Sequence, residues 1–330
     1  MRGLATTFSL VAVLAIAPAA MAQTPPLVPV PPPAPAPPVV PPKAGKIKIV
    51  VRGGQATRKL RYVARGGTVR VSGRVKPFVA GQTAMLEVIR RGKVISRKTA
   101  PIRRGGKVAF RFRAKRKGRY RLVVRHAPTP QQAAFSSRPA RVRAVVLRAG
   151  QGSRGTKVRL LQRGLRGLGY AVPVSGRYED GTSRAVLAFR KTNGLPRNGY
   201  ASAGIYSLVL RGRGAFRLRH PKAGKHVEFD WSRQVLVLAD KGKPRRVYHS
   251  SSGAPATPTV FGSFRFYRKD LGTNALGMVH SNYFIRGYAI HGYHTVPNHP
   301  ASHGCLRVPI PNALDIFRSV KMGEKIFVYR

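Results

Sequence analysis

Apolar and basic residues alternate along much of the chain between residues 46 and 148. The alternation is most regular over 69–75, 108–113 and 119–123. Because successive side chains of a strand point to opposite faces, this period of two predicts sheets with one buried and one solvated face. Glycines interrupt the pattern at intervals that are typical of short strands joined by turns. The region is therefore predicted to be a small β-sandwich whose solvated faces carry arginine.

The pattern changes to a helical period after residue 149. Val158, Leu161, Leu165 and Leu168 are spaced by three and four residues, which places them on one face of a helix that ends at Gly169. A second helix is predicted from 182 to 193. Residues 149–212 are therefore predicted to form a small helical domain.

Residues 225–330 return to short apolar runs separated by turns. We expect a strand–turn–strand unit at 227–238, further strands, a short helix at 312–319 and a last strand at 325–329. The chain is therefore predicted to be multidomain and mainly β.

The first 22 residues have the form of a signal peptide. Arg2 precedes an apolar run that ends Ala20-Met21-Ala22, a small-x-small cleavage pattern, and the run is too short for a membrane span. The proline-rich linker that follows, 23–45, is expected to be stiff and extended. We expect an exported protein that functions in the cell wall, periplasm or extracellular space; whether the signal is cleaved or tethers the chain to the membrane stays open.

The charge is strongly positive and unevenly spread. Lys and Arg number 62 against 9 Asp and Glu, and 30 of these cations fall in residues 46–148 with one acid, Glu87. Such an excess points to a polyanionic partner. Export makes nucleic acid an unexpected target and leaves anionic cell-wall polymers or lipid head groups. A soluble spacer with a merely solvated arginine face is the alternative.

Cys305 is the only cysteine, so it cannot form an internal disulfide. It lies in the sequence Ser302-His303-Gly304-Cys305-Leu306-Arg307, fourteen residues after His291. A lone cysteine with nearby histidines is a candidate nucleophile, because an imidazole can generate the reactive thiolate. The alternative is an inert buried cysteine.

A metal site is the competing interpretation of this region, because histidines cluster here. The spacings mimic those of zinc ligands, and the histidines concerned are His280, His291, His294, His299 and His303. No acidic residue lies between 271 and 312 to support such a cluster, and glycines flank the histidines as they flank nucleophile turns. We therefore expect no metal and no organic cofactor.

The helical region resembles the small three-helix peptidoglycan-binding domain. The matching positions are Val158, Leu161, Gln162, Leu165, Leu168, Gly169, Tyr170, Gly176, Tyr178, Thr182, Ala185, Val186, Phe189, Gly194 and Leu195. The sequence departs from that pattern at Ser175, where an acid is usual, and at Arg190, where glutamine is common. The sandwich is similar to immunoglobulin-like spacer modules by pattern alone.

The last hundred residues resemble the L,D-transpeptidase (YkuD-like) catalytic domain, which is β-rich. The resemblance rests on Thr257-Pro258, Gly262-Ser263-Phe264, His291-Gly292 and the block 302–307. About two extra residues between 258 and 262 could alter a loop near the substrate but include no candidate catalytic group.

The resemblance implies roles for the candidate residues. Cys305 is the expected nucleophile and His291 the expected base, held by a backbone carbonyl; proximity in sequence alone would have favoured His303. His303 would shape the turn, and Gly304 lets the backbone approach closely there. Backbone N–H groups at 303, 304 and 305 would form the oxyanion hole.

Four further residues are expected at the substrate. They are Ser302, Arg307, Gly292 and Tyr288. Arg307 could bind a substrate carboxylate or form a structural ion pair. Ser302 could bond within the turn, and Tyr288 could form a wall of the site or simply belong to the core.

The expected activity is cross-linking of peptidoglycan stem peptides through a Cys305 thioester, with release of D-alanine. The family further implies that carbapenems acylate the cysteine. Two alternatives remain: an L,D-carboxypeptidase, in which water resolves the thioester, and a non-catalytic protein that binds the wall or another polyanion.

Overall fold

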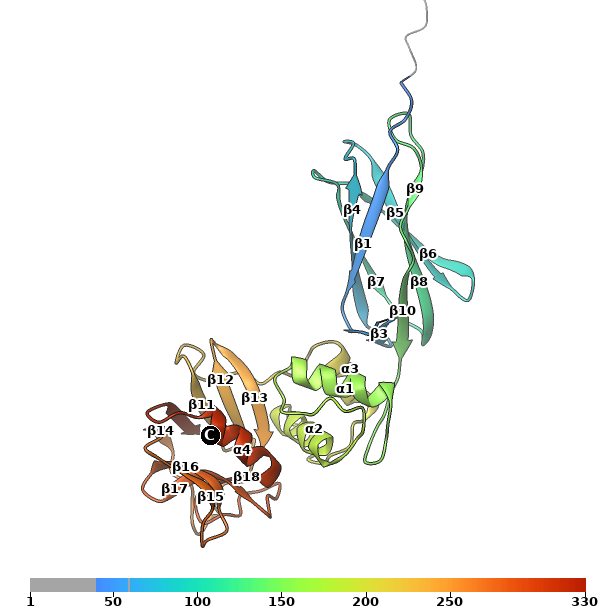
Figure 1. Cartoon of the computed structure of the whole chain (residues 1–330). Helices are drawn as coiled ribbons and strands as arrows, with labels where there is room; N and C mark the ends of the chain where they lie inside the picture. Colours follow the sequence, from blue (N-terminus) through green and yellow to red (C-terminus); the bar gives the residue numbers. More distant parts are fainter. Residues whose placement is uncertain (1–39, 59) are drawn as a thin grey trace, which may run out of the picture. The chain divides into compact units, whose positions relative to one another are not determined.

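The computed structural model describes residues 40–58 and 60–330. The predicted signal peptide and most of the proline-rich linker lie outside the described residues. No helix within them is long and apolar enough to cross a membrane. Most elements of the described chain are strands, and four are helices. Figure 1 shows their arrangement along the chain.

The basic region forms the predicted sandwich, and its strands follow the predicted alternation. One sheet has three strands in the order β1-β4-β7, with bounds Lys46–Arg52, Thr68–Lys76 and Lys107–Arg113. The other sheet has seven strands. Six of them follow the order β2-β3-β10-β8-β5-β6, and the short β9 pairs with β8. Their bounds are Gln55–Ala56 (β2), Arg61–Ala64 (β3), Ala140–Val145 (β10), Gly118–His126 (β8), Thr83–Arg90 (β5), Lys93–Pro101 (β6) and Phe135–Ser136 (β9).

Three helices follow: α1 (Thr156–Gly167), α2 (Asp180–Thr192) and α3 (Ala203–Leu210). The periodic leucines of α1 are buried as predicted. Arg190, one of the two departures from the family pattern, is itself buried and donates hydrogen bonds to the carbonyls of Pro196 and Tyr200. This arginine therefore ties the loop between α2 and α3 to the end of α2.

The C-terminal region contains two sheets and one helix. The first sheet has the order β13-β12-β11-β19-β14, with bounds Lys243–His249, Val235–Asp240, His226–Asp230, Lys325–Tyr329 and Gly262–Arg265. The second has the order β15-β16-β17-β18, with bounds Arg268–Thr273, Val279–Ile285, Tyr288–Tyr293 and Leu306–Pro309. Helix α4 (Ile310–Ser319) follows β18 and packs on the second sheet (Figure 1).

The helical region and the first C-terminal sheet share one hydrophobic core. Val235, Val237 and Val247 of β12 and β13 belong to the same buried cluster as Phe189 of α2. Backbone bonds cross the same contact, since Val247 N–H donates to Gly169 O at 2.8 Å and its carbonyl accepts from the N–H of the residue after Tyr170. The two regions are thus continuous in packing as well as in sequence.

A buried carboxylate fastens the connecting segment to this sheet. Glu228 of β11 is fully buried and accepts from the backbone N–H groups of Arg219 and His220, at 3.0 and 2.8 Å, and from the side chains of His226 and Tyr329. Burial opposes ionisation, but these donors together hold the pKa of Glu228 below its ordinary value. The carboxylate is therefore ionised at neutral pH and its donors are satisfied.

Glu228→Gln is expected to lower the free energy of unfolding by about 3 kcal/mol, because the amide accepts fewer bonds and leaves buried donors unpaired. The contribution of the carboxylate is present above pH 4.5 and is lost as the pH falls through its lowered pKa. Urea denaturation checks both effects. Glu179→Gln, at an exposed ion pair, is the matched control and should change the free energy by about 0.5 kcal/mol or less. Equal losses in the two variants would contradict the role given to Glu228.

Candidate active site

Cys305 lies in the turn directly before strand β18, beside the start of β17. The two strands are parallel, with His291 opposite Arg307. The half-buried Cys305 Sγ accepts a hydrogen bond from Ala289 N–H at 3.4 Å, and the thiol points toward Gly287 O at 3.6 Å. The parallel pairing therefore positions the thiol against the backbone of the strand that carries His291.

The His291 imidazole is buried, and its Nδ1 lies 3.0 Å from Gly292 O. A carbonyl can only accept, so this contact fixes the proton on Nδ1 and leaves the Nε2 lone pair unprotonated. The ring of Tyr293 meets the imidazole edge-on, with 5.7 Å between centroids. The arrangement gives the ring the tautomer that a general base requires.

The surroundings keep both reactive groups neutral at rest. Burial lowers the pKa of His291, and the nearby Arg307 charge lowers it further against the opposing bond to Gly292. Burial raises the pKa of the Cys305 thiol, while the Ala289 amide and Arg307 oppose that rise. Both directions favour a neutral Cys305 thiol and a neutral His291 imidazole at pH 7.

These shifts predict the pH dependence of the cysteine. Iodoacetamide alkylation of Cys305 should keep rising with pH to a midpoint above 9, because burial disfavours the thiolate. Acylation assisted by His291 should fall only below pH 6.5, since protonation of an imidazole with a lowered pKa removes the proton acceptor. Rates measured between pH 5 and 10, by mass spectrometry of the intact protein, check both limbs. Rapid alkylation that is constant from pH 6 upward would contradict the neutral pair.

Ser302 closes the turn that carries the cysteine. Its hydroxyl donates to Cys305 O at 2.6 Å and accepts from Gly304 N–H at 3.1 Å, and its side chain is buried. This geometry favours the bond within the turn over a substrate contact by Ser302. It also occupies the amide of Gly304, one of the three donors expected for an oxyanion.

Gly304 is required where Tyr288 crosses the turn. Its φ is +112°, and a Cβ at this position would lie 2.3 Å from Tyr288 Cε1. The Tyr288 ring is therefore packed against the turn that carries Cys305.

The His303 side chain is exposed, and within the described chain it makes no side-chain hydrogen bond. Within residues 40–58 and 60–330, no acceptor binds the backbone N–H groups of His303 and Cys305. Two amides on either side of Gly304 are thus available to a developing negative charge.

Comparison with known proteins identifies two domains in the chain. Residues 224–328 match the family model of the L,D-transpeptidase catalytic domain, and residues 154–206 match that of a putative peptidoglycan binding domain. The chain is 30% identical to the L,D-transpeptidase (residues 123–326) of Xylanimonas cellulosilytica DSM 15894, and the match covers 56% of this chain and 98% of that one with a TM-score of 0.52. The chain belongs to the L,D-transpeptidase family.

Two further solved L,D-transpeptidases match the chain at lower identity. The enzyme of Stackebrandtia nassauensis is 20% identical over 55% of this chain and 95% of its own, with a TM-score of 0.35. L,D-transpeptidase 3 of Mycobacterium tuberculosis is 16% identical over 32% of this chain and 61% of its own, with a TM-score of 0.30. No curated protein sequence matches the chain.

Arg307 and Gly292 pack against neighbouring side chains. The Arg307 guanidinium lies 4.1 Å from the centre of the Tyr293 ring and donates to Ala301 O at 3.3 Å. A Cβ on Gly292 would lie 2.7 Å from that of Ala313 in α4, so the strand and the helix need a glycine here. Tyr293, which touches both Arg307 and His291, was not predicted from sequence, although it is the next residue after His291-Gly292.

Two threonines of the segment 257–259 donate hydrogen bonds to the turn that carries Cys305. Thr257 Oγ1 donates to Ser302 O at 2.9 Å, and Thr259 Oγ1 donates to Gly304 O at 2.6 Å. The Thr257-Pro258 motif thus has a physical role, since it holds the carbonyls of the turn. Thr259 was not predicted from the sequence, where its only signal is its closeness to that motif.

A lysine of the helical domain supports the transpeptidase domain from within their shared core. Lys191 of α2 donates to Gln234 O at 3.2 Å, to His249 Nδ1 at 2.7 Å and to Ser250 O at 2.9 Å. The opposite nitrogen of His249 lies 2.8 Å from Val296 O, in the loop that leads to Ser302. Burial lowers the pKa of Lys191, while the three acceptors around its Nζ match the three N–H groups of an ammonium. Burial and the neighbouring lysine charge lower the pKa of His249 to about 3.

Lys191→Met is expected to lower the free energy of unfolding by about 2 kcal/mol, because three buried acceptors lose their donor. The loss is partly offset because the methionine carries no buried amine to desolvate. Chemical denaturation measures the change. Lys222→Met, at an exposed lysine, is the control and should stay within about 0.5 kcal/mol of wild type. A neutral result at Lys191 would show that the amine contributes nothing net to the contact.

Proposed function

We propose that the protein is a cysteine L,D-transpeptidase that cross-links peptidoglycan stem peptides in the cell wall. The observation that carries the proposal is the His291 Nδ1 contact with Gly292 O on β17, together with a half-buried Cys305 thiol in the turn that leads into the adjacent parallel strand β18. A base with its free nitrogen fixed and a nucleophile in a pinned turn are the two groups that acyl transfer needs.

In the first step the Cys305 sulfur attacks the carbonyl carbon of the third stem residue of a tetrapeptide. His291 Nε2 takes the thiol proton as the S–C bond forms. The carbonyl oxygen becomes an anion, which the N–H groups of His303 and Cys305 stabilise. When the tetrahedral intermediate collapses, the C–N bond breaks, the imidazolium returns its proton to the leaving amine, and D-alanine departs from a thioester.

In the second step the amine of another stem peptide attacks the thioester carbonyl. His291 now removes a proton from that amine, the C–S bond breaks and the thiol is restored. Neutral groups at rest suit this cycle, because the proton shuttles between sulfur, imidazole and amine without a net change of charge.

The helical domain is proposed to hold the enzyme on peptidoglycan, in line with its match to a putative peptidoglycan binding domain. The protein is proposed to be exported and to act in the wall, periplasm or extracellular space. Carbapenems are proposed to acylate Cys305, because they present a strained carbonyl to the same thiol. The cationic sandwich is proposed to contact anionic wall polymers.

The test is incubation of the full mature chain with purified disaccharide-tetrapeptide, followed by mass spectrometry of the products. We expect a dimer joined through two third-position residues, with release of D-alanine, and none after the thiol has been blocked with iodoacetamide. Tripeptide without dimer would replace the proposal by an L,D-carboxypeptidase. No thiol-dependent product from this donor would favour a wall-binding protein without this activity.

A further inference from the structure

The three-stranded sheet of the sandwich arranges like charges in rows. Its strands are in a register that sets Arg52 opposite Arg70 and Arg70 opposite Arg111. A second row, four positions along, sets Lys48, Arg74 and Lys107 side by side in the same way. The apolar residues that alternate with these cations point into the core, whereas Val50, Ser72 and Ala109 lie between the two rows on the outer face, and all six cations are exposed.

This arrangement is costly unless something neutralises it. Neighbouring strands lie about 4.8 Å apart, and like charges that face each other across them destabilise a sheet. β1, β4 and β7 contain no acidic residue. Glu87, the one acid between residues 46 and 148, lies in the other sheet and is bound to Arg97 and Arg125. The rows therefore lack an internal counter-charge.

The two outer faces of the sandwich differ in this respect. The seven-stranded sheet also sets Arg121 opposite Arg141 and Arg119 opposite Arg143, but it intersperses its outward arginines with Met85, Ile89 and Val123 and holds the only carboxylate of the sandwich. The three-stranded sheet has small or polar residues between its rows, and Val50 is its one large apolar residue that is strongly exposed. Only one face therefore combines dense positive charge with a polar surface.

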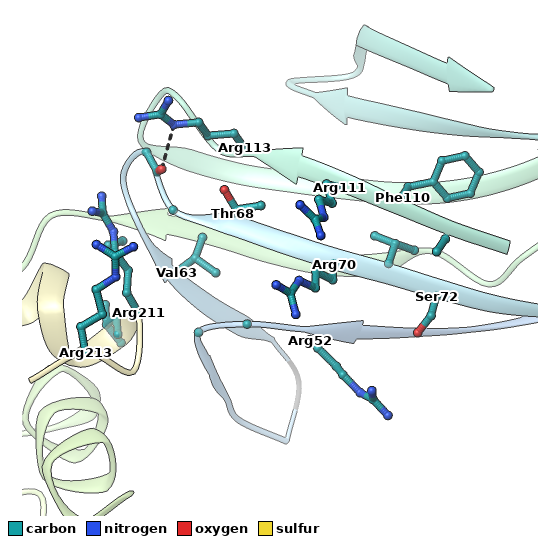
Figure 2. Close-up of a pocket in the computed structure, with 18 residues that line it drawn as sticks. Arg52, Val63, Thr68, Arg70, Ser72, Phe110, Arg111, Arg113, Arg211 and Arg213 are labelled. Atoms are coloured by element: carbon teal, nitrogen blue, oxygen red, sulfur yellow. Dashed lines mark hydrogen bonds between the residues drawn. The ribbon is translucent and has the colours of Figure 1, made fainter. Parts of the chain in front are cut away.

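The first row opens into a hollow of about 1120 Å³. Figure 2 shows Arg52, Arg70 and Arg111 beside it. Arg113 lies at the same hollow with its Nε held by Gly66 O at 3.1 Å, and Arg211 and Arg213 line it from the segment that begins at the end of α3. No acidic residue lines the hollow. Within the described chain the guanidinium groups of the first row have no acceptor, so they are available to a ligand.

We propose that this arginine hollow binds a polyphosphodiester chain of the cell wall. Guanidinium groups present paired donors that match phosphate oxygens, and the two rows lie about 13 Å apart along the strands, so an extended chain of phosphates can contact both. The face has no outward aromatic side chain on which a nucleobase could stack and almost no apolar surface to enter a membrane. The cell-wall source of the polymer rests on the proposed function; the phosphate chemistry of the site does not.

The test compares two variants of equal charge in the full chain. One is the row variant Arg52→Gln/Arg70→Gln/Arg111→Gln; the control is Arg121→Gln/Arg141→Gln/Arg143→Gln, on the outward face of the seven-stranded sheet. Calorimetry with short linear polyphosphate and with poly(glycerol phosphate) is repeated over a series of salt concentrations. We expect the row variant to bind roughly tenfold more weakly, with a salt slope smaller by about two, and the control to bind as wild type.

Three results would overturn the proposal. Equal losses in both variants would show a diffuse field of charge without a site. If poly-glutamate bound as tightly as the phosphate polymers, the site would have no preference for phosphate. If phosphatidylglycerol vesicles bound more tightly than the phosphate polymers, the ligand would be a membrane surface and not a polymer. Thermal unfolding separates folding from binding: without ligand the row variant should unfold at or above the wild-type temperature, because repulsion in the row is relieved. Acylation of Cys305, measured in parallel, should be unchanged in the row variant, so loss of the site and loss of the catalytic function are distinguishable.

Discussion

Cys305→Ala is expected to abolish acyl transfer, with a loss of roughly 10⁴-fold or more, because no other group can form the thioester. Ser302 cannot replace it, since its hydroxyl is buried and already bonded to Cys305 O and Gly304 N–H. Intact-protein mass spectrometry after incubation with tetrapeptide donor or a carbapenem should show an acyl adduct on the wild type and none on the variant.

The variant should still fold and still bind the wall. The Cys305 side chain is only half-buried and makes two weak contacts, so its loss disturbs little packing. Sedimentation with purified peptidoglycan should therefore be the same for both proteins. An acyl adduct that persists on Cys305→Ala would overturn the assignment of the nucleophile.

Periodicity predicted some of the strands and helices, and the family resemblance predicted the domains. The apolar–basic alternation at 69–75 and 108–113 identified β4 and β7, and the leucine spacing around 161 identified α1, because each pattern matches the geometry of one element. The prediction of a mainly β chain with a sandwich, a three-helix domain and a transpeptidase domain is confirmed. Helix α4 starts two residues earlier than predicted, since Pro311 is tolerated in a first helical turn.

Contacts between segments that are distant in the chain could not be predicted from the sequence. The row Arg52–Arg70–Arg111 depends on strand register, which composition does not reveal. Lys191 was not singled out from the sequence; it is buried because the helical domain shares its core with β12 and β13. The bond of Ser302 to the Gly304 amide likewise depends on the shape of the turn, and it reduces the three expected oxyanion donors to two.

The two histidines near Cys305 should differ sharply when each is replaced by glutamine. His291→Gln is expected to slow acylation by roughly 10²–10⁴-fold, because the amide cannot accept the thiol proton. His303→Gln should change the rate only a few-fold, since its side chain is exposed and only its backbone N–H is assigned a role. Carbapenem acylation followed by mass spectrometry, with single-turnover rates from pH 5 to 9, compares the two.

The pH profile separates loss of the base from loss of structure. In wild type and His303→Gln, the rate should fall as the pH drops below 6.5, through the lowered pKa of His291. In His291→Gln that inflection should disappear, and the remaining rate should rise steadily with thiolate formation toward and above pH 9. The reverse order of effects would make His303 the base and would leave the Gly292 carbonyl contact of His291 as a structural one. The proximity of His303 to Cys305 in sequence favours His303 as the base. The burial and the fixed tautomer of His291 favour His291 instead, because a base must hold its free nitrogen in place as the proton leaves the sulfur.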